Sequence, residues 1–449
     1  MERIFSYASC CLLLCFYFLQ TSCTPEPPTS NQVSTDQYSA DVANEWYAKA
    51  IEITPHTSGF TANVSARAMG YMGLALYESV VNGMEGYRSL SGSLDGFVLN
   101  TSYIDQDLYT YHWGAAANSA MASMLKNLYP NMPAADLESV DELEQSWKEK
   151  FAQETDLATL TRSVNIGRQI AEAVFEWSST DGGHEAYLYP TAPNFVPVAG
   201  PGRWTPPTSV KPLHPYWGNN RPFWAVNVTS SQPAPPKSYS EQMTSPFYFQ
   251  AKEVYNVGNA LTDEQKTIAH YWADDLGTMT TAGHLTNVLR QILIQEKANL
   301  ATAAEAYAKL GMGMNDALIA CWKCKYENSL MRPAPYIQSH INANWQPIVA
   351  APATPEYTSE HGAQAGVLSK VLTQFFGDNY AFNDTTYDSA ETAFDGSLRY
   401  YISFDDLANE AAFSRLYGGV HFRDAVMIGL AQGKIVGSNV NAMPFLENN

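Results

Sequence analysis

Three short stretches in the C-terminal part of the chain carry side chains that suit the binding of an oxyanion. They supply three cationic groups, a hydroxyl group and two imidazoles, a set too polar for core packing. Guanidinium and ammonium groups neutralise anionic oxygens, and an imidazole can exchange a proton or bond to a metal centre. We therefore expect one pocket to gather Lys325, Arg332, Ser359, His361, Arg415 and His421.

The first stretch is Lys325-Tyr-Glu-Asn-Ser-Leu-Met-Arg332-Pro333, and it follows an apolar run that is typical of a helix. Seven residues of α-helix turn through about 700°, so Lys325 and Arg332 are predicted to lie on one face. Both side chains are long enough to reach one anion beyond the helix end, which Pro333 is expected to impose. Taken alone, the pair is more typical of two solvated charges on an exposed face.

The second stretch is Pro355-Glu-Tyr-Thr-Ser359-Glu360-His361-Gly362, and an apolar helical run follows it. The start of a helix presents free amides and a positive dipole potential, which favour an anion. His361 at this point could act as a general acid or base toward a bound oxygen. The alternative is that Ser359 only caps the helix and His361 lies on the surface.

The third stretch is Ser414-Arg415-Leu-Tyr-Gly418-Gly419-Val-His421-Phe-Arg-Asp424, which joins an arginine to a histidine across two glycines. Glycines allow the backbone to pass close to a ligand. The planar guanidinium of Arg415 would hold oxygens with two parallel hydrogen bonds. His421 would offer a ring nitrogen to the central atom of the anion.

In this order and at these spacings, the three stretches resemble the signature of the vanadium-dependent haloperoxidase and type-2 phosphatidic-acid phosphatase superfamily. That signature reads K-x6-R-P, then P-S-G-H, then S-R-x5-H, and its first and third parts match in full. The flanking residues are similar to the bacterial haloperoxidase branch, including the run 316–322 and the pattern Trp272-x-x-Asp275. The resemblance covers nearly all of the chain beyond its first segment.

The resemblance implies vanadate as the cofactor, with phosphate able to occupy the same site. His421 would bind vanadium as its metal ligand, and His361 would hydrogen-bond the apical oxygen and help hydrogen peroxide to deprotonate. Asp275 would orient Arg415 without contacting the oxyanion itself. The groups implied to hold the oxygens are the side chains of Lys325, Arg332, Ser359 and Arg415 and the backbone N–H of Glu360.

Three functions are compatible with this pocket. The first is a vanadate-dependent haloperoxidase that oxidises halide with hydrogen peroxide. The second is an acid phosphatase of the same superfamily, which would cleave a phosphate ester through a phosphohistidine at His421 while His361 protonates the leaving group. The third is a non-catalytic envelope protein that merely retains an oxyanion pocket.

Two departures from the signature bear on this choice. Glu360 stands where the signature has glycine, and Thr354 stands where halide-oxidising relatives often carry an aromatic residue or a histidine. An inward carboxylate would oppose a bound anion by about 4 kcal/mol per charge pair at a separation of about 4 Å and an effective dielectric near 20. We therefore expect Glu360 to point outward or to pair with a cation such as Arg423.

The overall composition indicates a folded, acidic protein. Of its 449 residues, 45% are hydrophobic and 12% are aromatic, and the formal net charge is −19. Such a composition argues against extended disorder. Nucleic acids and anionic membrane surfaces need a basic face, so neither is an expected partner. Cations gathered at one place in an acidic chain indicate a small anion.

Residues 1–22 are typical of an export signal, because Arg3 precedes a short apolar run that ends before Cys23. The run is shorter than the about 20 residues that a comfortable membrane span needs. A tether over 23–40 follows, so the segment resembles a bacterial lipoprotein signal with lipid on Cys23. Gln20 and Thr21 fit that signal poorly, which leaves simple secretion as the alternative. The expected location is the bacterial cell envelope, or a secreted or periplasmic one.

The remaining chain, 41–449, is predicted to form an all-α haloperoxidase-like domain of two packed helical bundles. Apolar residues recur at spacings of three and four, and strand-like alternation is scarce. A loop rich in proline, glycine and aromatic residues spans 181–245, and the half that holds the anion site spans 315–433. Helices are expected within 41–81 (two), 113–128, 134–153, 157–178, 262–308, 315–331, 361–376 and 421–433.

Other patterns in the sequence are assigned structural roles. Cys321 and Cys324 form a C-x-x-C pattern in the middle of a helix, and we expect two packed thiols rather than a disulfide. His284 and Asp274 are expected to be structural. A zinc or haem site is not supported, because the sequence has no H-E-x-x-H motif and no four-ligand Cys/His cluster. A homodimer is compatible with the sequence, which does not decide the oligomeric state.

Overall fold

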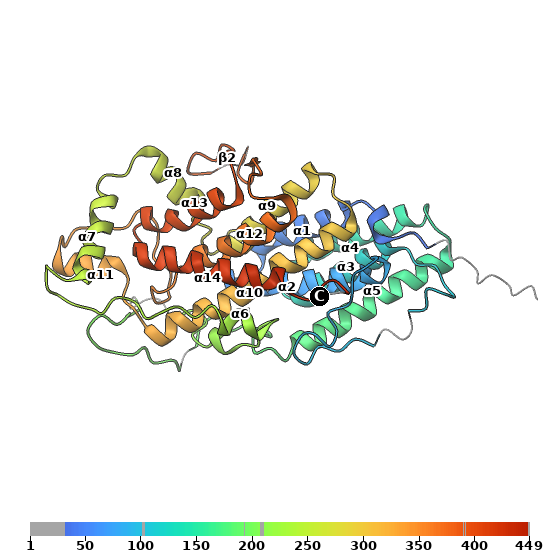
Figure 1. The fold of residues 1–449 in the computed structure, drawn as a ribbon, viewed down its shortest axis with the longest axis horizontal. Helices are drawn as coiled ribbons and strands as arrows, with labels where there is room; N and C mark the ends of the chain where they lie inside the picture. Colours follow the sequence, from blue (N-terminus) through green and yellow to red (C-terminus); the bar gives the residue numbers. More distant parts are fainter. Residues whose placement is uncertain are drawn as a thin grey trace, which may run out of the picture.

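A computed structural model describes residues 32–100, 104–192, 194–206, 211–388, 390 and 392–447. The predicted export signal, Cys23 and the first part of the tether lie outside these residues. Within them, the fold is built of fourteen α-helices and one two-stranded sheet (Figure 1). The prediction of an all-α fold is confirmed. None of the helices in the described ranges is long and apolar enough to cross a membrane.

The helices differ widely in length, from a single turn to eight turns. They are α1 (Asp41–Ile53), α2 (Ala62–Val80), α3 (Trp113–Leu128), α4 (Ala134–Phe151), α5 (Leu157–Ser178), α6 (Ala225–Thr229), α7 (Pro246–Gly258), α8 (Asp263–Tyr271), α9 (Thr280–Gln295), α10 (Leu300–Asn328), α11 (Pro333–His340), α12 (Glu360–Phe376), α13 (Phe404–Tyr417) and α14 (Arg423–Asn441). Strands β1 (Phe382–Asp384) and β2 (Arg399–Tyr401) pair antiparallel.

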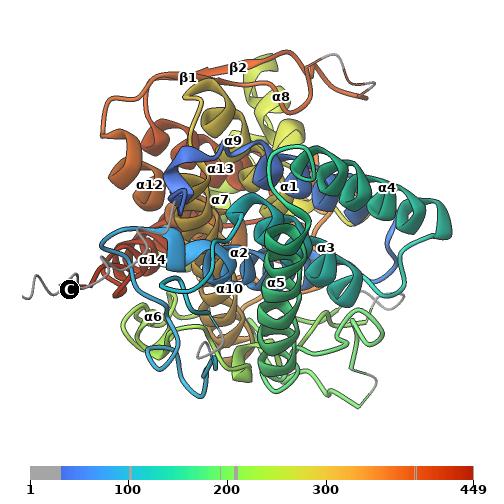
Figure 2. The same cartoon turned by 90° about the vertical axis from the view of Figure 1, so that its right-hand side faces the viewer.

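Helix α10, with 29 residues, lies at the centre of the molecule between two groups of helices (Figures 1 and 2). It packs against α2 on one side and against α12 and α14 on the other. Helices α3 and α5 complete the first group, and α13 completes the second. The core is continuous through α10, whose side chains are almost all buried. Of the predicted site residues, Lys325 lies on this largely buried helix.

Two pairs of helices approach closely because one partner carries glycine at the crossing. A Cβ atom on Gly73 of α2 would lie 2.8 Å from the Cα atom of Ala308 on α10. A Cβ atom on Gly429 of α14 would lie 2.5 Å from the carbonyl oxygen of Ser359, at the start of α12. The first contact brings the backbones of α2 and α10 close together. The second places the N-terminus of α12 directly against α14.

The loop over 181–245 is ordered by a carboxylate of the central helix. Asp316 on α10 accepts hydrogen bonds from the backbone N–H of Phe223 (2.8 Å) and of Trp224 (3.0 Å), and from the side chain of Asn227 (2.8 Å). Burial raises the pKa of Asp316 to about 6. The ring of Phe223 is buried in the core. The part of this loop around Phe223 and Trp224 is therefore fixed to α10.

The described end of the predicted tether is packed rather than flexible. The hydroxyl group of Thr35 is buried and donates to the carbonyl oxygen of Val80 (2.8 Å). The backbone N–H of Ala40 donates to the carbonyl oxygen of Ala298 (3.1 Å). The prediction of a flexible tether as far as residue 40 was therefore wrong for 32–40, because backbone pairing attaches these residues to the connection between α9 and α10.

A buried ionic cluster holds the turn that follows α8. Both ring nitrogens of His284 face carboxylates: Nδ1 lies 3.1 Å from Asp274 Oδ1, and Nε2 lies 3.0 Å from Asp384 Oδ2. The ring also stacks on Trp272, with 4.3 Å between the ring centroids. Burial opposes a charge on His284, but the two carboxylates outweigh burial and raise its pKa to about 10. The cluster has the structural role expected for His284 and Asp274.

Replacement of His284 with glutamine is expected to destabilise the fold by about 3–5 kcal/mol at neutral pH, because two buried carboxylates lose their cation. The folded pKa of about 10 lies above the ordinary value of about 6.5. The contribution is therefore complete below about pH 6.5 and is lost as the pH rises toward 10. Urea unfolding between pH 6 and 10 should show the difference between wild type and variant shrinking with rising pH.

The exposed His56 provides a matched control, since its ion pair with Asp136 lies at the surface. His56→Gln should change the free energy of unfolding by less than about 1 kcal/mol. A His284→Gln difference that stays constant across this pH range would contradict a charged imidazole in the cluster.

Candidate active site

The first stretch keeps its two cations together, but not on one helix face. Helix α10 ends at Asn328, and Ser329 adopts a left-handed conformation with φ of 46°. Arg332 then has extended backbone angles (φ −71°, ψ 160°). The prediction of one shared helix face was therefore wrong, because the residue before Pro333 avoids the helical conformation. Lys325 remains in the last turn of α10 and is fully buried.

Lys325 and Arg332 converge on the segment that precedes the second stretch. The Nζ atom of Lys325 donates to the carbonyl oxygens of Pro355 (3.0 Å) and Glu356 (3.2 Å). The Nε atom of Arg332 donates to the carbonyl oxygen of Thr354 (3.0 Å), and its Nη2 atom donates to the hydroxyl oxygen of that residue (3.0 Å). These bonds join the first and second stretches, and they give Thr354 a defined role as acceptor.

The second stretch forms the N-terminus of α12, which begins at Glu360. Ser359 is the N-cap residue, and its hydroxyl oxygen accepts from the backbone N–H of Gly362 (3.5 Å). The N–H of Ser359 itself donates to the carbonyl oxygen of Ala425 (3.1 Å). The first amides of a helix have no intrahelical acceptor and favour negative charge. The helix start predicted here is confirmed, and its free amides would favour an anion.

In the third stretch the backbone folds back over Arg415, which lies in the last turn of α13. The N–H groups of Val420 (3.1 Å) and His421 (3.3 Å) both donate to the carbonyl oxygen of Arg415. Gly419 makes this reversal possible, since its φ of 78° is rarely adopted by other residues. The carbonyl oxygen of Val420 also accepts from Nη1 of Arg332 (2.9 Å). The first and third stretches are thereby joined.

The contacts of His421 determine which ring nitrogen carries the proton. Its Nδ1 atom lies 3.0 Å from Oε1 of Glu356, an oxygen that also accepts from the N–H of Phe422 (2.8 Å). Its Nε2 atom lies 3.0 Å from Nη1 of Arg332, which can only donate. Nδ1 is therefore protonated and Nε2 carries the lone pair. A ligand atom bonded to Nε2 would replace the hydrogen bond from Arg332.

The ring of His421 is neutral. Burial lowers its pKa well below the ordinary value, and the nearby charges of Arg332 and Lys325 lower it further. A neutral imidazole is the form that binds a metal centre, and a carboxylate behind it makes it a stronger ligand. Glu356 is thus a functional residue that sequence reasoning missed. The sequence pattern assigns Glu356 no role, because its partner His421 lies 65 residues further along the chain.

Arg415 is buried and held mainly by a backbone carbonyl group. Its Nη1 atom donates to the carbonyl oxygen of Trp272 (3.1 Å), in the turn after α8. Asp275 in the same turn attracts the guanidinium electrostatically, and burial raises the pKa of this carboxyl group. That Asp275 orients Arg415 stays a prediction from the resemblance. The ionic cluster around His284 holds Trp272 by stacking and so supports the position of Arg415.

His361 is also buried and neutral. Burial lowers its pKa well below the ordinary value, and the charge of Arg415 acts in the same direction. Its Nε2 atom lies 3.1 Å from the hydroxyl oxygen of Thr281. Its Nδ1 atom makes no hydrogen bond within the described part of the chain and lies 3.7 Å from Oε1 of Glu360. The ring can therefore exchange a proton with a bound ligand.

The side chain of Glu360 does not behave as expected. Arg423 pairs with Glu253 instead of with Glu360. The carboxylate of Glu360 approaches His361, and its charge acts on all three cations of the site. The prediction of an outward carboxylate or a pair with Arg423 was therefore wrong. As the first residue of α12, Glu360 lies where the helix dipole and the cations both favour a negative group.

The three cations need an anion. Burial lowers the pKa of Lys325 and of Arg415, and it lowers the pKa of Arg332 to about 10. Buried charges of like sign raise the free energy of the site until an opposite charge balances them. Two buried nitrogen atoms at this place lack a hydrogen-bond partner among the described residues, namely Nε of Arg415, which is a donor, and Nδ1 of His361. These features fit vanadate or phosphate.

A cavity of about 600 Å³ opens beside the cations, a volume typical of small-molecule sites. Arg415 and His361 line it together with Glu360, whereas Lys325, Arg332 and His421 do not. The loop over 181–245 contributes to its wall, so this loop borders the site. The other lining residues are Thr61, Ala62, Asn63, Thr191, Lys211, Leu213, Ala273, Asp274, Asp275, Leu276, Thr280, Trp322, Ala350, Ala351, Pro352, Ala353 and Thr354.

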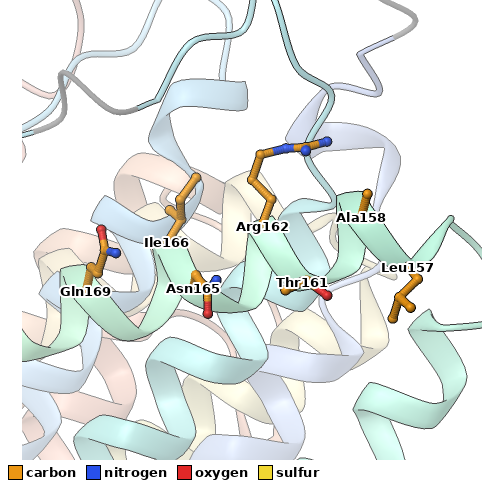
Figure 3. A pocket seen from close by; sticks show the side chains of 7 residues that line it. All are labelled: Leu157, Ala158, Thr161, Arg162, Asn165, Ile166 and Gln169. Atoms are coloured by element: carbon orange, nitrogen blue, oxygen red, sulfur yellow. The ribbon is translucent and has the colours of Figure 1, made fainter.

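A second hollow of about 610 Å³ lies along the exposed side of α5 (Figure 3). It carries one cation, Arg162, and neither an imidazole nor a carboxylate. This hollow therefore offers no comparable chemistry. Cys321 and Cys324 are free, buried thiols, as predicted. In the described ranges, no group of three or more His, Cys, Asp and Glu residues is arranged to hold a metal ion.

Replacement of Glu356 with glutamine is expected to weaken vanadate or phosphate binding by about 10–100-fold, the usual effect of removing a partner behind a metal ligand. Glutamine keeps the size of the side chain but lacks the negative charge of Glu356, and this charge makes His421 a stronger ligand. Titration calorimetry in the absence of peroxide and halide checks this. Glu253→Gln, at the surface, is the control, and equal affinities in the two variants would contradict the role of Glu356.

The chain is similar to several known proteins. A family model described as the VCPO second helical-bundle domain matches residues 338–444, which include α12, α13 and α14. The crystal structure of the first bacterial vanadium-dependent iodoperoxidase is 30% identical in sequence with a TM-score of 0.78. That match covers 90% of this chain and 96% of the iodoperoxidase.

Two further solved structures share the fold at lower identity. They are the holo and apo forms of a bacterial vanadium-dependent chloroperoxidase, at 16% and 17% identity, each with a TM-score of 0.66. The holo match covers 87% of this chain and 94% of the other, and the apo match covers 92% and 100%. No curated protein matches the sequence.

Proposed function

This chain belongs to the vanadium haloperoxidase superfamily, and from that membership we propose that it is a vanadate-dependent haloperoxidase, which oxidises halide with hydrogen peroxide. One observation carries the proposal above all others. The lone pair of a neutral, buried His421 faces a buried cationic group, Arg332, while its other nitrogen is fixed by Glu356. This arrangement supports a ring nitrogen that bonds to the centre of an oxyanion.

Vanadate, when bound, supplies the centre at which hydrogen peroxide becomes reactive toward halide. The chain would hold its oxygens through Lys325, Arg332, Arg415 and the amides at the start of α12. Nε2 of His421 would be the single protein ligand of vanadium. The guanidinium and ammonium groups are held by backbone carbonyl oxygens before the ligand arrives, so little reorganisation accompanies binding.

His361 would move the proton that peroxide loses on binding. Its neutral Nδ1 atom is free to accept, and Thr281 fixes the ring through Nε2. The cavity beside it, with Trp322 and Leu213 in its wall, would admit the halide and an organic acceptor.

Iodide is the first halide that we propose, because the relative with 30% identity is an iodoperoxidase. We further propose that the protein acts outside the cytoplasm after export by residues 1–22, with a lipid on Cys23 in the lipoprotein form.

The test loads the purified protein with vanadate and supplies hydrogen peroxide with iodide or bromide. Triiodide formation and bromination of a diketone dye are the readouts, and hydrolysis of a phosphate ester by the vanadate-free protein is measured beside them. Vanadate-dependent oxidation of either halide is the expected result. Ester hydrolysis without halide oxidation would identify the phosphatase alternative. No activity in either assay and no vanadate binding would favour the non-catalytic alternative.

A further inference from the structure

Glu360 introduces a carboxylate where the signature of the superfamily has glycine. Its side chain is 13% exposed and faces the cavity, and its Oε1 atom lies 3.7 Å from the unpaired Nδ1 atom of His361. None of the hydrogen bonds formed within the described part of the chain involves this carboxylate. Its position therefore reflects the electrostatic attraction of the site rather than a structural bond.

The backbone at this position does not require glycine. Glu360 is the first helical residue of α12 and does not have a positive φ. A side chain is therefore accommodated without strain, and the chemical consequence of the exchange is the added charge.

The charges around the site are partly balanced without a ligand. Asp275 attracts Arg415, and Glu356 attracts Arg332 and Lys325. Burial raises the pKa of Glu356 to about 7, so these two carboxylates offset the cations only in part. The charge of Glu360 acts on all three cations as well. An oxyanion that enters thus meets cations that carboxylates already attract.

We propose that Glu360 is a built-in counter-ion that competes with the bound oxyanion for the three cations, so that this chain holds vanadate and phosphate weakly and exchangeably. The proposal rests on the oxyanion site that the proposed function uses. In this proposal Glu360 controls the affinity for the cofactor. Its carboxylate must move away from the cations, toward the cavity, before the oxyanion is bound.

Two variants separate charge from size. Glu360→Gln removes the charge and keeps the size, whereas Glu360→Gly removes both. The control is Glu327→Gln, which removes a charge from an exposed side chain on the surface of α10. Affinities for vanadate and for inorganic phosphate are measured by titration calorimetry at neutral pH, without peroxide or halide. Circular dichroism and thermal unfolding verify that each variant is folded.

We expect both Glu360 variants to bind each oxyanion at least about tenfold more tightly than wild type, which corresponds to about 1.4 kcal/mol. Glu327→Gln should bind like wild type. Unchanged or weaker binding by Glu360→Gln would overturn the proposal, because the carboxylate would then assist the site, for example by exchanging a proton with His361. Tighter binding by Glu360→Gly alone would also overturn it, since size rather than charge would be the cause.

The outcome for the proposed function is read separately. Tighter binding in both variants together with no halide oxidation by any protein would contradict the haloperoxidase and leave the role of Glu360 standing. Halide oxidation by wild type together with unchanged affinities in the variants would support the haloperoxidase and contradict the role of Glu360. Binding by none of the proteins would contradict both.

Discussion

Replacement of His421 with alanine is expected to abolish halide oxidation and to lower the affinity for vanadate by more than about 100-fold. Loss of a group that merely supports a metal ligand costs about 10–100-fold, so loss of the ligand itself should exceed that range. The lone pair on Nε2 of His421 faces Arg332, and in the variant the Glu356 carboxylate would lose His421 as a donor but keep the N–H of Phe422. Calorimetric titration with vanadate and the triiodide assay measure the two effects.

The matched control is His184→Ala, because His184 is partly exposed and lies outside the site. It should retain wild-type affinity and turnover. Wild-type turnover in His421→Ala would refute the assignment of this residue as the ligand. Since loss of His421 removes a donor from a buried carboxylate, thermal unfolding must show that the variant is folded before binding is compared.

Replacement of Arg332 with alanine is expected to have two large effects. The side chain donates to Thr354, Val420 and His421, and so ties three segments of the chain together. The variant loses these hydrogen bonds, and hydrogen bonds to a charged group contribute about 1.5–3 kcal/mol each, so it should be less stable than wild type by a similar amount or more. The affinity for vanadate should also fall by about 100-fold or more, because a cation and a planar pair of donors are lost. Urea unfolding and calorimetry measure these effects.

Arg332→Lys distinguishes charge from geometry, since lysine keeps the cation but cannot reproduce the fork of the guanidinium. Its affinity should lie between those of wild type and Arg332→Ala. Arg168→Ala on the exposed side of α5 is the control and should match wild type. If Arg332→Ala unfolds at the same urea concentration as the control, Arg332 does not join the three segments in the way described.

The site could be predicted in part because each of its three stretches is local in sequence. The types and spacings of the cations and histidines identified Lys325, Arg415, His361 and His421 before any geometry was known. The partners of these side chains could not be found in that way. Nζ of Lys325 and Nη1 of Arg415 bind backbone carbonyl oxygens, and every residue has such a group. Only the fold determines which carbonyl oxygens face them.

Glu360 and Arg332 show a second limit. The direction of the side chain at the first position of α12 was predicted wrongly, since it depends on charges brought there by α10 and α13. Likewise, the spacing of Lys325 and Arg332 suited one continuous helix. Ser329 ends that helix early, and a left-handed serine is not predictable from its type alone.

Helix boundaries followed the strength of the local signals. Helices α3 and α5 have the predicted bounds, because both are amphipathic and begin at a capping residue, His112 and Asp156. Helix α13 was not predicted, although the hydroxyl oxygen of Ser403 accepts from the N–H of Asp406 at its start. Its apolar side chains are spread around the helix, so the periodic pattern is weak.

The most direct measurement of the central claim is an anomalous difference map from crystals soaked in vanadate. A single vanadium peak within bonding distance of Nε2 of His421, among Lys325, Arg332 and Arg415, is the predicted result. The hydrogen bond from Arg332 to Nε2 should then be absent. Vanadium bound elsewhere, or in this pocket without a bond to His421, would contradict the account.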